Sequence, residues 1–326
     1  MIKNRNIADD AEIASHKFAG TWTEFGDKYY VDYNGGSDSM SGRTKGTAVK
    51  TLSKAHTLCT TNQNDAIIIK GYSTVAESAM IDFSKSRVHV FADGGPMPLY
   101  GMGASAKVQL GVTTDTGDIA ILKNTGVRNS FNGIKFDSAN TLEQSVYAVA
   151  DGGEYARWNN CEFYKSTHLT TALATEFLLN GDSAQFSRCQ FGDLVTGKGG
   201  SGVPRANILV SRETISGAVA RNVYMENCIF LQKALHVDAN FIYGAGTTDI
   251  ERMLLLVNPI FINAILAVAT VADAITFGGA QTEGNILLVN PSGSNITAFA
   301  EASQNVFVTG AVPTAATSGI SVEVAA

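Results

Sequence analysis

Three cysteines recur at matching positions of a repeated motif, and thiols at regular spacing could bind a metal ion or form disulfides. Cys161, Cys189 and Cys228 each stand two residues before a Phe. The sequence has neither a CxxC pair nor a Cys/His pair at zinc spacing. Two interpretations are left, a disulfide or metal cluster and a stack of buried thiols. We favour the stack, because free cysteine behaves as a small buried hydrophobic residue, and it indicates assembly in a reducing cytoplasm.

Carboxylate pairs are the next candidates, because a glycosidase needs two of them at a fixed separation. Glu162 is the best starting point, but Gln190 and Ile229 stand at its equivalent positions in the following repeats. The other carboxylates lie around turns, where Asp most often caps backbone amides. We therefore predict no catalytic residue, no metal site and no cofactor. The turn carboxylates are Asp151, Glu154, Asp182, Asp193 and Asp238.

Other local motifs give weak signals. The stretch 196–202 is rich in glycine, but its Lys precedes the glycines and no helix is expected after it, so we interpret it as an insertion loop and not a phosphate-binding loop. The 35–38 loop could hold Ca²⁺, although a structural turn is the better interpretation. Tyr155, Trp158 and Tyr164 could stack on sugars from an outward face or pack at a corner.

The element that must position all these residues is the repeat itself. Its Phe residues follow one another at intervals of 28, 39 and 31 residues, and the fourth copy has Pro in place of Cys. Each copy alternates small, polar and large residues, which predicts a short strand with one buried face. A strand that returns every ~30 residues is typical of a solenoid. The predicted core ladder is Cys161, Phe163, Cys189, Phe191, Cys228, Phe230, Pro259 and Phe261.

The start of the repeat region carries a fold resemblance. Tyr30-Val31-Asp32 is followed by a Gly-Ser-Asp loop, by Lys50-Thr51-Leu52 and by the apolar run 65–72. This order resembles the N-terminal entry of right-handed parallel β-helix proteins of the pectate-lyase-like superfold. The resemblance implies an all-β, single-stranded right-handed parallel β-helix whose open end is closed by a short helix near 51–60, with Thr51 as its N-cap. From about residue 65 to 310 we expect roughly eight coils and a rod of about 40 Å.

The hydrolase and lyase motifs of that superfold are not found. Polygalacturonase-like hydrolases carry Asn-Thr-Asp, Asp-Asp, Gly-His-Gly and Arg-Ile-Lys segments, and none of these occurs here. No carboxylate cluster beside an arginine matches the calcium site of pectate lyases. Phage tailspike glycosidases have no fixed motif, so this comparison leaves a polysaccharide hydrolase or lyase open as an alternative.

Residues 1–28 precede the repeats and are expected to be an extended N-terminal arm, with the β-helix at 29–310 and a C-terminal tail at 311–326. Sparse apolar residues in a polar segment suit binding to a partner surface. Residues 7–17 resemble a short segment common near the ends of bacteriophage fibre and head-associated proteins. We expect the arm to bind the major capsid protein or another virion protein through Ile7, Ile13, Lys17 and Phe18.

The composition and net charge limit the classes of binding partner that we expect. The net charge is −6, so a nucleic-acid partner is not expected. The N-terminus lacks the apolar segment of a signal peptide, and the apolar stretch 264–277 is too short to span a bilayer, so no membrane partner is expected either. After Arg252 there is no Lys or Arg. A surface this poor in charge predicts self-association, and we expect a homotrimer.

Together these features resemble those of a bacteriophage virion structural protein. The expected role is non-enzymatic: a capsid decoration or head-fibre protein on the capsid exterior, assembled in the cytoplasm of the host bacterium. The alternative is a tailspike or tail fibre that binds or cleaves a host surface glycan.

Overall fold

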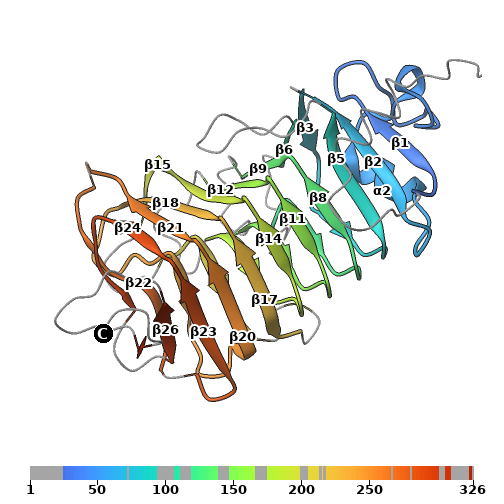
Figure 1. The fold of residues 1–326 in the computed structure, drawn as a ribbon. Coiled ribbons are helices and arrows are strands. Elements are labelled where there is room, and N and C mark those ends of the chain that lie inside the picture. The colour runs from blue at the N-terminus through green and yellow to red at the C-terminus, as the bar shows by residue number, and fades with distance from the viewer. Residues whose placement is uncertain are drawn as a thin grey trace, which may run out of the picture.

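The structure is a computed structural model, and it describes residues 25–71, 73–93, 106–110, 119–138, 147–165, 175–198, 205–212, 215, 218–265, 267–279, 281–300, 305–309 and 323–324. Three long sheets, here called A, B and C, run along one elongated body (Figure 1). The chain passes from sheet A to sheet B to sheet C and returns to sheet A one strand further on. This is the predicted right-handed parallel β-helix.

Sheet A has 11 strands, of which the last pairs antiparallel with its neighbour and the others are parallel. In spatial order they are β1 (Lys28–Val31), β2 (Asp65–Lys70), β5 (Val88–Asp93), β8 (Ser130–Asn132), β11 (Arg157–Asn159), β14 (Gln185–Ser187), β17 (Ala220–Glu226), β20 (Ile250–Val257), β23 (Gly284–Val289), β26 (Val306–Thr309) and β27 (Glu323–Val324).

Sheets B and C have eight parallel strands each, one per coil, which matches the predicted number of coils. Sheet B consists of β3 (Ser73–Glu77), β6 (Ala106–Leu110), β9 (Ile134–Ser138), β12 (Glu162–Lys165), β15 (Gln190–Lys198), β18 (Ile229–Ala234), β21 (Ile260–Asn263) and β24 (Ser292–Ser294). Sheet C consists of β4 (Ile81–Phe83), β7 (Leu122–Asn124), β10 (Tyr147–Asp151), β13 (Thr175–Leu179), β16 (Ile208–Val210), β19 (Ile242–Gly244), β22 (Val271–Phe277) and β25 (Ile296–Ala300).

The interior is one continuous apolar core whose spine is a ladder of aromatic rings. Phe136, Phe163, Phe191, Phe230 and Phe261 occupy the same position of successive strands in sheet B. Their ring centroids follow one another at 5.9, 5.0, 5.1 and 4.9 Å, and all five side chains are fully buried. Offset-stacked rings at such distances add stabilisation beyond the area that they bury.

The repeated motif differs from the sequence prediction in one respect. It does not lie within one strand but spans the corner between sheets A and B. Asn160, Arg188, Asn227, Asn258 and Asn290 follow the last residue of a sheet A strand and have φ angles of 49–53°. A left-handed residue turns the chain sharply into sheet B, and Asn tolerates this conformation better than most residues. The Cys or Pro comes next, so its alternation with Phe resembled that of a strand.

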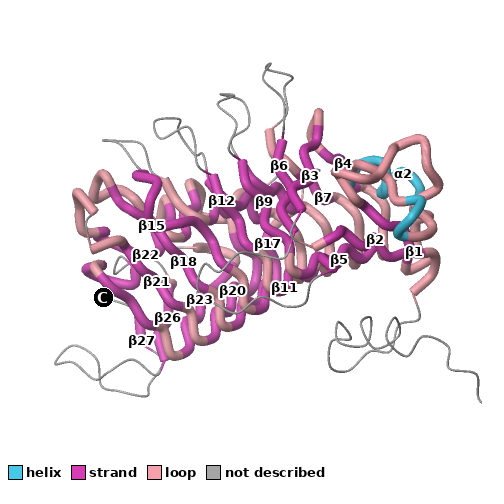
Figure 2. The backbone as a smooth tube through the Cα atoms, turned by 90° about the horizontal axis from the view of Figure 1, so that it is seen from above, coloured by secondary structure: helices cyan, strands magenta, loops and turns pink. Residues whose placement is uncertain are grey.

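A helix closes the N-terminal end of the core, as predicted. The helix α2 (Leu52–Leu58) is preceded by a short 3₁₀ helix, η1 (Lys45–Thr47). The side chain of Thr51 accepts a hydrogen bond from the backbone N–H of Lys54 and caps α2. Leu52 and Ala55 are fully buried in the core above the first coil. The cyan helix lies at the end of the body beside β1 and β2 (Figure 2).

The prediction of an insertion loop at 196–202 is wrong for its first three residues. Residues 196–198 belong to β15, and Lys198, its last residue, is buried. The glycine-rich composition of this stretch is typical of a loop, so the sequence did not indicate that the strand continues to residue 198. Residues 199–204 lie outside the described part of the chain, as do 1–24 and 311–322. The arm residues Ile7, Ile13, Lys17 and Phe18 therefore have no described structure, and the division into three segments stays a prediction.

Candidate functional site

The cysteines of the core ladder lie inside the solenoid at the A–B corner. Cys161, Cys189 and Cys228 are free thiols with at most 1% of their surface exposed. The Cys161 Sγ lies 3.4 Å from the carbonyl oxygen of Phe131, and the Cys189 Sγ lies 3.2 Å from that of Trp158. Burial and the neighbouring thiols raise the pKa of Cys189. Cys189 is therefore a poor nucleophile, and all three buried thiols fill space in the core.

The positions directly opposite Glu162 on the neighbouring strands of sheet B hold no acid. Glu162 of β12 pairs in register with Lys135 of β9 and Gln190 of β15. Gln190 in turn pairs with Ile229. The residues directly opposite the best starting carboxylate for glycoside hydrolysis are thus a lysine and a glutamine, not a second acid.

The turn carboxylates are occupied by local contacts. Asp193 Oδ1 accepts hydrogen bonds from the N–H groups of Val195 and Thr196 at 2.7 and 2.6 Å. Asp182 forms an ion pair with Arg221, with 3.2 Å between the charged atoms. In the glycine-rich loop near residue 35, the Oδ1 atom of Asp32 accepts from the N–H of Gly35 at 3.1 Å. These carboxylates stabilise turns, as Asp commonly does.

Asp151 is the exception, because it is a fully buried carboxylate at the corner between sheets C and A. It accepts hydrogen bonds from Trp158 Nε1 and Asn124 Nδ2, both at 2.8 Å, and from the N–H of Gly153 at 3.1 Å. Burial raises its pKa to about 6, and the three hydrogen bonds offset only part of that shift. The group fixes Trp158 inside the core and has no access to a substrate.

The three aromatic residues noted in the sequence have different environments. Trp158 is fully buried and stacks on Phe131 with 4.1 Å between ring centroids, so it packs at a corner. Tyr155 is 46% exposed, and the guanidinium of Arg128 lies 5.6 Å from its ring centroid. Tyr164 is half-buried beneath the ammonium group of Lys135. An outward Tyr could contact a ligand, but these two rings already contact cations.

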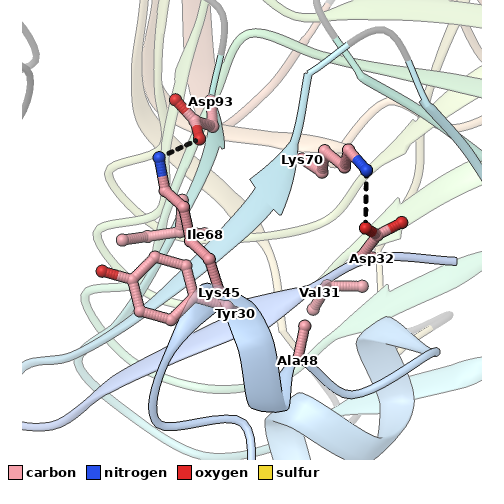
Figure 3. A pocket seen from close by; sticks show the side chains of 8 residues that line it. All are labelled: Tyr30, Val31, Asp32, Lys45, Ala48, Ile68, Lys70 and Asp93. Carbon is pink, nitrogen blue, oxygen red and sulfur yellow. Dashed lines mark hydrogen bonds and ion pairs between the residues drawn. The ribbon is translucent and has the colours of Figure 1, made fainter. Parts of the chain in front are cut away.

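A pocket of about 340 Å³ opens on the outer face of sheet A in its first strands. Two ion pairs flank it, Lys45 with Asp93 at 3.1 Å and Lys70 with Asp32 at 2.6 Å (Figure 3). Nothing in the sequence indicated this pocket, because it depends on the parallel pairing of β1 with β2 across the inserted helix. It is lined by Tyr30, Val31, Asp32, Lys45, Ala48, Ile68, Lys70 and Asp93.

The chemistry of this pocket suits binding better than catalysis. Burial raises the pKa of Asp32, but the bonds from Lys70 and from the backbone N–H groups of residues 34 and 35 outweigh it, and the net pKa is lowered. The carboxylate therefore stays ionised and is not poised to donate a proton. Tyr30 and Ile68 form an adjacent pair in register between the two ion pairs.

The described chain enters the fold beside this pocket. Phe25 packs on the outer face of sheet A, with its ring centroid 5.3 Å from that of Phe91 and 5.5 Å from that of His89. Phe91 is the register partner of Ile68 in the pocket wall. Any segment that precedes residue 25 therefore starts from the outer face of sheet A at the N-terminal end of the body.

The opposite end, here called the C-terminal face, consists of the last coil and the connection that precedes β22. β24 and β25 are the terminal strands of sheets B and C, and all three residues of β24 are exposed. The core residues Ile296 and Phe299 of this coil are only partly buried. Ile265 and Val268 are 93% and 75% exposed. This end of the body thus has the terminal strands of sheets B and C, with two exposed apolar side chains on the connection of the preceding coil.

The described residues include no group of three or more His, Cys, Asp or Glu side chains that could hold a metal ion. In the same part of the chain, no helix has the length and apolar character needed to cross a membrane.

Comparison with known proteins identifies the fold but no family. No protein-family model matches the sequence, and no curated protein matches it significantly. Among solved structures, pectate lyase Pel9A is similar with a TM-score of 0.58 and 14% identity over 83% of this chain, which spans 64% of that lyase. This likeness is one of fold alone.

Two further structures are similar with lower scores. Pectin methylesterase PemA from Erwinia chrysanthemi has a TM-score of 0.47 and 11% identity, with 87% of this chain and 93% of the esterase covered. The ORF18 protein of Geobacillus virus E2 has a TM-score of 0.45 and 9% identity, with 80% and 58% covered.

Proposed function

We propose that this protein is a non-enzymatic structural component of a bacteriophage particle. Its specific role in this proposal is that of a capsid decoration or head-fibre protein on the capsid exterior. The N-terminal arm binds the major capsid protein or another virion protein, and the β-helix projects from the capsid surface as a homotrimer. The virus-particle part of the proposal rests on the resemblance of residues 7–17 to segments of phage fibre and head-associated proteins.

The observation that carries the structural role is the difference between the two ends of the solenoid. Helix α2 covers the first coil, whereas no described strand pairs with the outer edges of β24 and β25, and two core residues of the last coil are only partly buried. An open strand edge is a template for pairing with another chain. Exposed Ile265 and Val268 add apolar surface, and the region after Arg252 has no cationic side chain that would oppose close packing.

Self-association through the C-terminal face is tested by placing charges on it. The double variant Ile265→Asp/Val268→Asp should convert the trimer to monomers, because it places two desolvated carboxylates per subunit in the interface. The matched control is Val195→Asp, since Val195 is 81% exposed on β15 and remote from this face. Native mass spectrometry and analytical ultracentrifugation measure the result. A trimer that persists in the double variant, or a wild-type monomer at all concentrations, contradicts this part of the proposal.

Attachment through the arm is tested by deleting residues 1–20. The shortened protein should keep the unfolding temperature of the full chain and lose its binding to purified particles. A reconstruction of the whole virion would give the location and the number of copies. Retained attachment would remove the arm from the proposal.

The enzymatic alternative gives a separate readout. Purified protein incubated with the polysaccharide of the host surface should release neither reducing ends nor unsaturated sugars. Release of either product would overturn the non-enzymatic role, whatever the attachment experiment shows.

A further inference from the structure

The corner between sheets B and C holds a buried cluster that neither the core ladder nor the proposed function uses. Glu176 lies on β13 of sheet C, Lys198 ends β15 of sheet B, and Asn207 immediately precedes β16 of sheet C. Their exposed fractions are 1%, 3% and 0%. Lysine and glutamate are almost never this deeply buried unless they are paired, so the cluster needs a specific explanation.

One carboxylate bridges the amine and the carboxamide. The Lys198 Nζ contacts Glu176 Oε1 in a buried ion pair, and Asn207 Nδ2 donates to Glu176 Oε2 at 3.2 Å. The register explains the second contact, because Phe177 pairs with Ile208 and so brings the preceding residues, Glu176 and Asn207, side by side.

A glycine provides the room in which the amine and the carboxamide meet. Gly192 has a φ of 79°, and a Cβ atom at this residue would collide with Asn207 Nδ2 and lie 3.0 Å from Lys198 Nζ. The two nitrogen atoms therefore border the same small volume. Any side chain at position 192 would occupy that volume and separate the two groups.

The carboxamide is fixed in orientation. Asn207 Nδ2 also donates to the carbonyl oxygens of Phe191 at 3.2 Å and Leu231 at 2.9 Å. The Oδ1 atom of Asn207 is buried and has no hydrogen-bond partner. An amide held through its nitrogen keeps its carbonyl carbon in a constant position relative to the amine.

The surroundings favour a neutral amine. Burial, and after it the positive charge of Arg205, lowers the pKa of Lys198 to about 7. A neutral amine avoids the cost of a second positive charge beside Arg205 in a medium of low dielectric constant. An unprotonated lysine amine is the nucleophilic form.

We propose that Lys198 and Asn207 join spontaneously in an intramolecular isopeptide bond, with Glu176 as the catalytic proton carrier. The Nζ atom attacks the Asn207 Cγ atom and forms a C–N bond. Glu176 accepts a proton from Nζ and delivers a proton to Nδ2. The bond between Cγ and Nδ2 then breaks and ammonia leaves. The atoms balance without an oxidant, a cofactor or a second substrate.

The bond would tie the end of a sheet B strand to the start of the following sheet C strand. It bridges the B–C corner between the end of β15 and the start of β16. It is a covalent modification of this chain, and it does not depend on the proposed virion role.

Intact-mass spectrometry of the unaltered protein is the first test. Bond formation lowers the mass by about 17 Da, the mass of ammonia. Trypsin digestion of the denatured protein then locates the bond. Without it, cleavage yields 189–198, 199–205 and 206–212 as separate peptides. With it, trypsin cannot cleave after the acylated Lys198, so 189–205 is recovered joined to 206–212.

Variants test the role of each group. Glu176→Gln should slow bond formation by about 100-fold or more, because it removes the proton carrier and keeps the shape. Lys198→Met should keep its full mass, and trypsin should release its 189–205 and 206–212 peptides separately. Asn207→Asp should still join to Lys198, with the loss of water, about 18 Da, in place of ammonia. Circular dichroism of each variant should match that of the unaltered protein.

Several outcomes would overturn the inference. One is recovery of the three separate peptides from freshly purified and from aged wild-type protein. Another is a loss of about 18 Da from the wild type with Lys198 joined to Glu176 in place of Asn207. Unchanged bond formation in Glu176→Gln would remove Glu176 from the mechanism.

Discussion

The A–B corner and the B–C corner are made by the same chain in the same coils, yet they are built in opposite ways. At the A–B corner of five successive coils, a sheet A strand passes to the next strand through a single left-handed residue, which is followed by Cys or Pro. At the B–C corner the connections differ in length, and one coil buries Glu176, Lys198 and Asn207 together. Regularity at one corner fixes the stacking of coils, and this leaves the other corner free to vary.

The largest loss of stability is expected from a substitution that removes one aromatic ring from the Phe ladder beside the regular corner. Phe191→Ala should lower the free energy of unfolding by about 3–5 kcal/mol, because it leaves a cavity between Phe163 and Phe230. Guanidinium unfolding followed by circular dichroism measures the change. Tyr155→Ala is the control, since its half-exposed ring should cost no more than about 0.5 kcal/mol. Equal effects would mean that the ladder is not the stabilising element.

The corner between sheets C and A holds a buried carboxylate, so its contribution to stability should depend on pH. The pKa of Asp151 is raised to about 6 at the C–A corner, from an ordinary value of 3.8. A raised carboxyl pKa gives stability that is complete below pH 3.8 and is lost as the pH rises through about 6. The loss should be on the order of 3 kcal/mol.

The measurement compares unfolding of the wild type and Asp151→Asn across pH 4–8. The difference in unfolding free energy between the two proteins should shift in favour of the variant as the pH rises. If the two proteins depend on pH in parallel over that range, the buried carboxylate does not titrate as described.

A smaller effect tests the left-handed residue itself. Asn258 has a φ of 50°, and its side chain bonds to that of Asn227 at 3.1 Å. Asn258→Ala should cost about 1 kcal/mol, because alanine tolerates the left-handed region poorly. Asn258→Gly should change stability by only a few tenths of a kcal/mol. Thermal unfolding of both variants distinguishes a conformational cost from the loss of the side-chain hydrogen bond, which the two variants share.

The smallest expected effect is a gain. Arg188 has a φ of 53° at the position where the other coils from Asn160 onward have Asn. Arg188→Asn should stabilise the protein by about 0.5 kcal/mol, because Asn is several-fold enriched in this conformation. A rise in the midpoint of unfolding is the expected readout. A fall would show that Arg188 makes a contact worth more than its conformational cost.

The sequence was sufficient to predict the repeated residues at the A–B corner, but it did not indicate the buried cluster at the B–C corner. The spacing of Phe163, Phe191 and Phe230 was sufficient for the coil period, and Thr51 for the capping helix. The corner conformation of Asn160 was missed, because small, polar and large residues alternate across this turn as they do in a strand.

The buried cluster could not be foreseen, for two physical reasons. Lys198 stands before a run of glycines, whose composition is that of a loop. Glu176 is distant from it in sequence, and only the register between β13 and β16 brings Glu176 beside Asn207. The pocket at Tyr30 likewise needs the pairing of β1 with β2, which residues 32–64 separate in the chain.

Because the same two-residue A–B corner recurs in successive coils, the length of the body can change only by whole coils. From Asn160 to Phe261, successive coils place their left-handed residue, their Cys or Pro and their Phe at equivalent positions, so a coil of this kind can be gained or lost as a unit without exposing a new kind of surface. Every such step changes the rod by about 4.8 Å. In a chain built this way, the distance between the two ends can be set in steps of one coil, while the ends themselves stay unchanged.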